Sequence, residues 1–146
     1  MLKIEASTVI HRPVEDVFVV VSNHENYPKW SPGVLEVKKT SSGSIGFGTS
    51  WRSVSKRLGR RRETESEIVE YEPNRKVTRQ HTQGMPVRDR FTFEIAPGGC
   101  TRVVETIEAE PDGLFKLATP VLEPLLKRQL EAALANLKEL MEACSL

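Results

Sequence analysis

Hydrophobic and polar residues alternate along the first segment of the chain. In residues 2–11, Ile4, Ala6 and Ile10 fall on one side, and charged or polar residues dominate the other. A period of two residues is typical of a β-strand with one buried face. Apolar residues after Pro13 then follow helical spacing, and proline is well tolerated at the start of a helix. The pattern predicts a strand followed by a short helix.

Segment 23–33 contains two prolines and is predicted to be a loop or a single helical turn. From residue 34 to residue 110, segments of strand-like composition are separated by turn sequences rich in glycine, proline and asparagine. The predicted strands are 34–41, 48–57, 60–71, 75–82, 87–96 and 101–110. Consecutive strands joined by short turns pair in antiparallel fashion.

The last part of the chain, residues 114–143, has the spacing of one long helical region. Leu122, Leu126 and Leu130 belong to a leucine stripe on one side of this helix. Two prolines interrupt the pattern near its start, so we expect a kink or a new helix start at 120–124.

This order of elements predicts an α+β fold, a curled seven-stranded antiparallel sheet gripping a long C-terminal helix, with two short helices after the first strand. Seven strands at ~4.8 Å spacing make a sheet about 34 Å wide, whereas one helix is only ~10 Å across. The sheet must therefore curl around the helix, and the space left between them is the expected ligand site. Residues 1–146 are expected to form a single domain of this kind.

Composition and charge narrow the classes of function. Basic and acidic residues nearly balance, with a net charge of +1, so net charge gives no case for a nucleic-acid-binding or membrane-surface protein. No apolar run approaches the ~18 residues of a membrane span, so no stable membrane insertion is expected. The N-terminus has no apolar signal core and the two cysteines have no motif spacing, so a cytoplasmic location is expected. The three histidines are scattered, and neither a metal site nor a cofactor is predicted.

Strand pairing predicts which residues face the helix. We assume that a tight turn pairs Arg57 with Arg60, and that the next hairpin continues the same alternation. The residues predicted to face inward are Trp51, Ser53, Ser66, Ile68, Arg79, His81, Asp89, Phe91, Phe93 and Ile95.

The last strand is ambiguous. A two-residue glycine turn would place Val104 and Thr106 inside. The more apolar face instead carries Val103 and Ile107, with Glu105 between them. We prefer this second face, which requires a three-residue connection or a bulge.

A tightly packed core rarely contains so many polar groups, so these residues favour a solvated pocket for a ligand that is partly polar. Arg79 is suited to holding a carboxylate, phosphate or enolate oxygen, and an ion pair with Asp89 or Glu105 is the competing interpretation. His81 is a candidate general acid or base because histidine titrates near neutrality. The competing interpretation is a structural strand histidine.

Other conspicuous residues have simpler interpretations. Trp51 is favoured as a core residue over a cavity wall, and Trp30 is expected to anchor its loop against the sheet. His11 and His24 lie at element ends and are expected to be exposed. The basic cluster at 56–62 is interpreted as a solvated hairpin tip rather than a site for an anionic ligand, membrane or RNA.

Several short segments, taken in order, resemble a known superfamily over nearly the whole chain. They are I-H-R-P-V-E-D-V-F at 10–18, Y-P-K-W-S-P at 27–32, G-T-S-W-R at 48–52, E-I-V-E-Y-E-P at 67–73, C-T-R-V-V at 100–104 and L-K-E-L-M-E at 137–142. The chain resembles the START-like or helix-grip superfamily, also called the birch-pollen-allergen fold, and within it the bacterial polyketide cyclase/dehydrase and lipid transport branch. The resemblance implies a shared cavity but no shared catalytic motif, so the fold alone does not decide the function.

We therefore expect a protein that binds a hydrophobic small molecule of the lipid, polyketide or isoprenoid type, as a monomer or homodimer. The first alternative is a cofactor-independent polyketide cyclase/dehydratase with Arg79 and His81 as catalytic residues. The second alternative is a chaperone-type protein-interaction module. The candidate ligand-binding residues are Trp51, Ser53, Ser66, Ile68, Arg79, His81, Asp89, Phe91, Phe93, Glu105, Leu122, Leu126 and Leu130.

Overall fold

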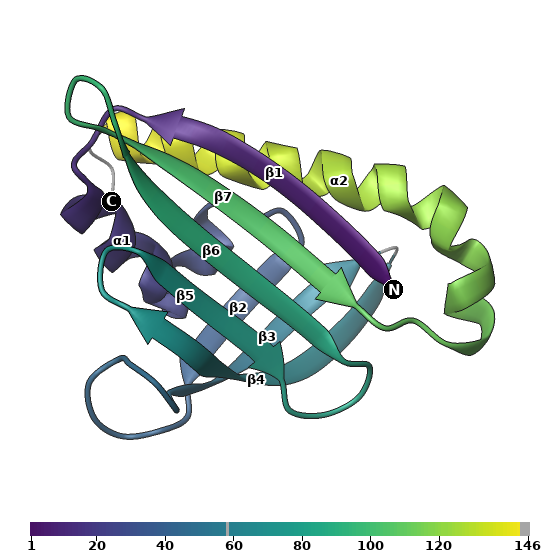
Figure 1. Ribbon diagram of the computed structural model, residues 1–146. Helices are drawn as coiled ribbons and strands as arrows, with labels where there is room; N and C mark the ends of the chain where they lie inside the picture. The colour runs from purple at the N-terminus through teal and green to yellow at the C-terminus, as the bar shows by residue number, and fades with distance from the viewer. Residues whose placement is uncertain (58, 144–146) are drawn as a thin grey trace.

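The computed structural model describes residues 1–57 and 59–143. The strands are β1 (Leu2–Ile10), β2 (Val34–Lys39), β3 (Ser50–Arg57), β4 (Arg60–Glu72), β5 (Lys76–His81), β6 (Val87–Ala96) and β7 (Cys100–Ala109). The helices are α1 (Val14–Ser22), the short 3₁₀ helix η1 (His24–Lys29) and α2 (Gly113–Glu142). Within the described residues, the seven strands form one antiparallel sheet in the order β1-β7-β6-β5-β4-β3-β2 (Figure 1). The predicted α+β helix-grip architecture is confirmed.

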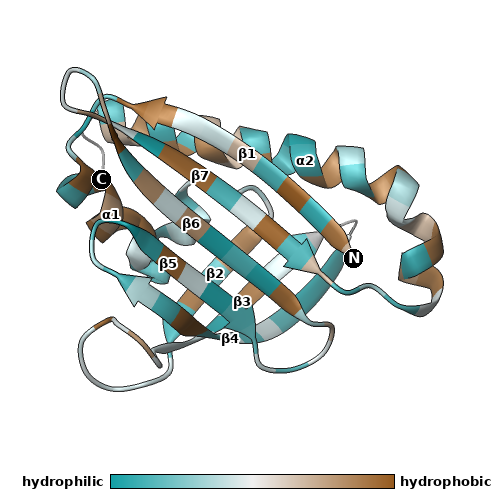
Figure 2. Ribbon diagram, in the orientation of Figure 1, coloured by the Kyte–Doolittle hydropathy of each residue, from teal (hydrophilic) through white to brown (hydrophobic). Residues whose placement is uncertain are grey.

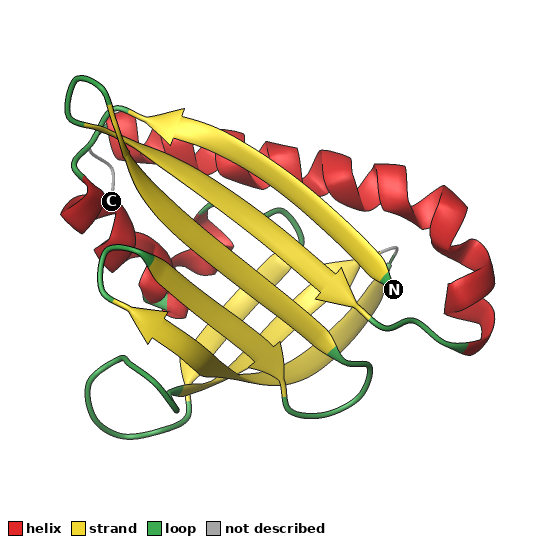
Figure 3. Cartoon of the chain, in the orientation of Figure 1, coloured by secondary structure: helices red, strands yellow, loops and turns green. Residues whose placement is uncertain are grey.

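The sheet is strongly curved, so that the half formed by β2, β3 and β4 turns behind the half formed by β5, β6 and β7 (Figure 3). Helix α2 runs beside β1 at one edge of the sheet (Figure 1). None of the described helices is both long enough and apolar enough to cross a membrane.

The predicted hairpin registers are confirmed. Arg57 pairs with Arg60 across a turn in which Gly59 has φ +76°, a conformation that glycine adopts without strain. On the next strand pair, Ser66 lies opposite His81 and Ile68 lies opposite Arg79. The pairing of β3 with β4 follows from its turn, as the sequence indicated. In the β4–β5 hairpin, Glu72 pairs with Lys76 across a three-residue connection, and a bulge between Ile68 and Glu70 restores the predicted pairing.

Strand β7 presents the face that we preferred. Ala96 pairs with Cys100, which leaves a three-residue connection between β6 and β7. Val103 and Glu105 are fully buried as a result. The prediction for Ile95 is wrong, because this side chain is 82% exposed. Ile95 lies on the predicted face, opposite the buried Thr101 of β7, but the pairing of β6 with β5 ends at Thr92, so no strand flanks Ile95 on its other side.

The segment between β1 and β2 forms one wall of the core. Pro13 precedes α1, whose apolar stripe of Val14, Val17, Phe18 and Val21 is buried. After it, the side chain of Asn23 accepts a hydrogen bond from a backbone N–H of the next turn and caps η1. The predicted loop or single helical turn at 23–33 is thus a 3₁₀ helix, placed against the sheet.

Helix α2 has two different halves. Its C-terminal half is buried through Leu130, Leu134, Leu137 and other apolar residues. Its first half, residues 113–125, contains no buried residue. The predicted proline break does not divide the helix in two, but the first turns run at an angle to the rest (Figure 1).

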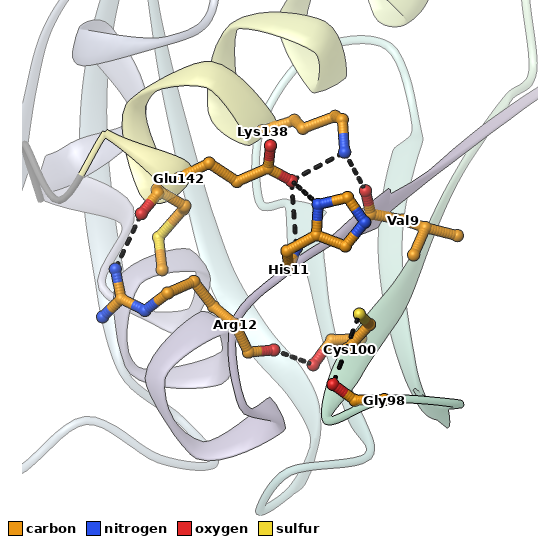
Figure 4. A network of polar contacts seen from close by, with 9 residues as sticks. Val9, His11, Arg12, Gly98, Cys100, Lys138 and Glu142 are labelled. Carbon is orange, nitrogen blue, oxygen red and sulfur yellow. Dashed lines mark hydrogen bonds and ion pairs between the residues drawn. The ribbon is translucent and has the colours of Figure 1, made fainter.

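Polar contacts fix the C-terminal end of α2 to the start of the chain (Figure 4). Lys138 donates through Nζ to the carbonyl of Val9 and to Glu142, at 2.6 Å in each case. Glu142 also accepts from the backbone N–H of His11 at 3.0 Å, and Arg12 Nη1 donates to the carbonyl of Met141 at 2.7 Å. The helix is therefore anchored at one end, and its first half projects from that anchor.

Candidate functional site

A cavity of about 350 Å³ lies between the curved sheet and α2. This volume falls at the lower end of the ~300–1,000 Å³ typical of small-molecule sites. Ile4, Val87, Ile107 and other aliphatic residues form the apolar part of its wall. The predicted site residues that line it are Ser53, Ser66, Arg79, His81 and Asp89 from the sheet and Leu126 and Leu130 from α2.

The remaining predicted site residues do not line this cavity. Trp51, Ile68, Phe91, Phe93 and Glu105 are buried in or beside the main core, and Leu122 is partly buried on the first half of α2. The aromatic residues pack against Phe18 of α1, His24 of η1 and Trp30, the residue that follows η1. Phe93 contacts Phe18 with ring centres 5.2 Å apart, and Phe91 contacts Trp30 at 6.0 Å. Alternation along a strand assigns the inner face, but it does not distinguish a cavity wall from packed core.

An ion pair lies at the polar wall of the cavity. Arg79 is 3% exposed, and its Nη2 lies 3.5 Å from Oδ2 of Asp89, the residue directly opposite on β6. The guanidinium also lies over the rings of Phe91 and Tyr27, 5.4 and 5.9 Å from their centres. This arrangement supports the ion-pair interpretation of Arg79, with cation–π contacts that help to offset its burial.

Several polar atoms of this cluster make no well-formed hydrogen bond to a described residue. They include both terminal nitrogens of Arg79 and Oδ1 of Asp89, two residues that line the cavity. Buried polar groups are almost always paired, so unpartnered donors and acceptors beside a cavity indicate room for a polar ligand group or for water.

Glu105 and both histidines of the cluster have pKa values shifted toward their neutral forms. Burial raises the pKa of Glu105 well above its usual value, and the neighbouring Asp89 adds to this effect while Arg79 opposes it. Burial also lowers the pKa of His24 well below its usual value, helped by the positive charge of Arg79. Burial lowers the pKa of His81, although Asp89 and a backbone hydrogen bond with Met85 act in the opposite direction. Glu105 thus favours its protonated acid form, and both histidines favour the free base.

The cavity is also lined by residues that sequence reasoning did not assign to the site, and two of them are the aromatic residues His24 and Tyr27 of η1. His24 was expected to be exposed, but it is buried and lines the cavity together with Tyr27. Their rings lie 4.9 Å apart, because a separation of three residues places both on one side of η1. Burial raises the pKa of Tyr27 well above its usual value, so the hydroxyl keeps its proton. The spacing of a histidine and a tyrosine within one helical turn was the available signal.

The chemistry of the cavity is that of an apolar chamber with one polar wall. Arg79 offers N–H donors, Tyr27 offers a hydroxyl, and His81 as a free base offers a proton acceptor. Among residues 1–57 and 59–143, no group of three or more His, Cys, Asp and Glu side chains is arranged to hold a metal ion.

Comparison with known proteins adds a family model and a set of solved structures. The model for "Polyketide cyclase / dehydrase and lipid transport" matches residues 1–142. We found no significant match among curated proteins.

Solved structures of the same fold cover almost the whole chain. The protein TTHA0849 of Thermus thermophilus superposes with a TM-score of 0.83 at 21% identity, covering 99% of each chain. The Zhui aromatase/cyclase of a Streptomyces species gives 0.77 at 15% identity, covering 94% of this chain and 91% of the other. A START superfamily protein of Mycobacterium smegmatis gives 0.71 at 14% identity, covering 98% and 96%. These likenesses establish the fold.

Proposed function

Because the chain belongs to the polyketide cyclase/dehydrase and lipid transport family, which shares a fold for hydrophobic ligands, we propose that it binds a small hydrophobic molecule with an oxygen function at one end. The cavity between the sheet and α2 is the proposed site. The single observation that carries the proposal is the placement of a buried, incompletely hydrogen-bonded Arg79 in the wall of an otherwise largely apolar cavity. Lipids, polyketides and isoprenoids of modest size fit this description.

The proposed roles follow from the geometry. Leu126 and Leu130 contact the hydrocarbon part of the ligand from the helix side. Arg79 donates to the ligand oxygen, and Asp89 holds the guanidinium in place from the opposite strand. Ser66 and Ser53 line the cavity on the β3–β4 side and supply further hydroxyl groups.

The direct test is native mass spectrometry of gently purified protein, followed by extraction and identification of any retained molecule. A cavity-filling variant gives the matched comparison. Ser53→Trp places an indole in the cavity, whereas Arg52→Trp places the same side chain on the exposed face of the same strand. We expect the Ser53 variant to lose the retained molecule and the Arg52 variant to keep it. Equal retention by both would show that the ligand lies elsewhere.

Catalysis is a second candidate, favoured by the presence of Arg79 and of His81 with a lowered pKa in the same cavity wall. A neutral His81 would accept a proton from a carbon next to a ketone, and Arg79 would stabilise the enolate oxygen that develops. The test is conversion of a linear poly-β-ketone analogue to a cyclised product by the purified protein. His81→Gln should lower turnover by ~10²-fold or more while binding persists, because glutamine cannot take up the proton. Absence of turnover by the unaltered protein would leave binding as the function.

A further inference from the structure

The first half of α2 exposes a run of large apolar side chains. Leu114 is 83% exposed, Leu117 is 80% exposed and Val121 is 77% exposed, while Phe115 and Leu125 are about half exposed. Single exposed apolar residues are ordinary, but five on one short stretch of helix are not. Figure 2 shows these turns of the helix projecting beyond the end of the sheet.

These residues are poorly covered by the rest of the described chain. No residue of 113–125 is buried, and the hydrogen bonds of Asn136, Lys138 and Glu142 that join α2 to other segments lie in its other half. Exposure of these apolar side chains to water is unfavourable in free energy, and a partner that covers them would remove this penalty.

A basic hairpin lies next to this helix. Residues 56–63, at the β3–β4 turn, contain five basic residues and one acidic residue, although the whole chain has a net charge of only +1. Arg60, Arg61 and Arg62 are exposed, and the guanidinium of Arg62 lies 5.8 Å from the ring centre of Phe115. The hairpin and the first turns of the helix thus form one continuous surface.

This surface surrounds one end of the cavity. Arg62 and Leu126, which belong to the hairpin and to the adjoining part of the helix, both line the cavity. Met85, 38% exposed in the β5–β6 connection, lines it from a third side. We call the combined patch the mouth surface. It consists of Lys56, Arg60, Arg61, Arg62, Leu114, Phe115, Leu117, Val121 and Leu125.

We infer that the mouth surface docks the protein onto a bilayer that contains anionic phospholipids. An apolar helix face that lies in the headgroup region, with neighbouring basic residues that meet lipid phosphates, is the usual way in which a protein binds a membrane surface without spanning it. A second copy of the chain is a poorer occupant, because a two-fold contact repeats the same patch and brings two basic hairpins to one small interface. Docking would place the cavity entrance at the lipid surface. The inference stands on the exposed patch and does not depend on which ligand the cavity holds.

Vesicle sedimentation tests the inference with the full chain. The protein is mixed with phosphatidylcholine vesicles that contain or lack phosphatidylglycerol. We expect binding to the anionic vesicles that weakens as salt rises, and little binding to the neutral ones. The double variant Leu117→Asp, Val121→Asp should bind at least about tenfold more weakly, since it removes inserted apolar area. Reversal of charge at Arg60 and Arg61 to glutamate should also cost at least about tenfold, because each basic residue near the anionic surface contributes a severalfold factor.

Matched controls lie at the opposite end of the sheet. Ile95→Asp alters an equally exposed apolar residue, and Arg75→Glu alters an exposed basic residue; both should bind vesicles as the unaltered protein does. Circular dichroism establishes that each variant is folded. The inference is overturned if anionic vesicles are not bound, or if Ile95→Asp weakens binding as much as the helix variant. It is also overturned if light scattering shows a dimer that the helix variant dissociates while no vesicle binding occurs.

Discussion

Removing one partner of the Arg79–Asp89 ion pair should destabilise the folded protein, because the other partner is left buried without a counter-charge. The variant Arg79→Met keeps much of the buried volume of the side chain but strands Asp89 beside the carboxyl of Glu105. Breaking a fully buried ion pair from one side costs about 3–5 kcal/mol, because a charge stays behind without a partner. The side chain of Asp89 is 18% exposed, so water relieves part of this cost. We therefore expect the free energy of unfolding to fall by about 2–3 kcal/mol.

Urea denaturation followed by circular dichroism measures this loss, provided that the denaturant dependence is unchanged between variants. At about 2–4 °C per kcal/mol for a chain of this size, the melting temperature should fall by roughly 4–12 °C. Asp89→Leu alone strands the arginine and should cost a similar amount. The double variant Arg79→Met, Asp89→Leu leaves no unpaired charge at either position, so it should recover at least half of the sum of the two losses.

The double-mutant cycle shows whether Arg79 and Asp89 stabilise the fold as a coupled pair or independently of each other. If the losses simply add, the 3.5 Å approach does not represent an energetically coupled pair. If Arg79→Met changes the free energy of unfolding by less than about 0.5 kcal/mol, water in the cavity already solvates the guanidinium, and the buried-pair reasoning fails.

Three further predictions follow from other buried and anchoring residues. Glu105 has a raised pKa in the folded protein, so its contribution to stability is present below pH 4.5 and is lost as pH rises toward the folded pKa. Glu105→Gln should therefore flatten the decline in melting temperature as pH rises above 4.5. Glu142 has a pKa lowered chiefly by its hydrogen bond to Lys138, so its contribution is present above pH 4.5 and is lost as pH falls through the folded value; Glu142→Gln should remove that acid-side loss, measured as melting temperature against pH. Phe91→Ala should lower the free energy of unfolding by about 3–5 kcal/mol, whereas Ile95→Ala on the same strand should change it by less than about 0.5 kcal/mol, because only Phe91 is buried.

The contrast between Phe91 and Ile95 shows what the sequence can specify. Both lie on the same predicted face of β6, which was assigned inward because it is the more apolar face. Turns are local, so two or three residues determine them, and the β3–β4 turn sets the predicted register of that pair. The predicted register of β4 with β5 also depends on a bulge between Ile68 and Glu70. Whether the end of a strand is covered is not local either, because it depends on where the neighbouring strand ends and where the helices pack. For this reason the inner face was predictable and the end of the core was not.

The same distinction explains the site. Arg79 and His81 were found because strand pairing places them opposite Ile68 and Ser66, and that pairing could be inferred from neighbouring segments of the sequence. His24 and Tyr27 were missed because they reach the cavity from a short helix whose orientation depends on packing against the sheet. The electrostatics of the cluster depend on all of these elements together, since burial in the assembled fold, with neighbouring charges from several elements, moves the pKa of Glu105 upward and that of His24 downward. A single strand can reveal that a charged residue points inward, but only the assembled fold determines whether that residue keeps its charge.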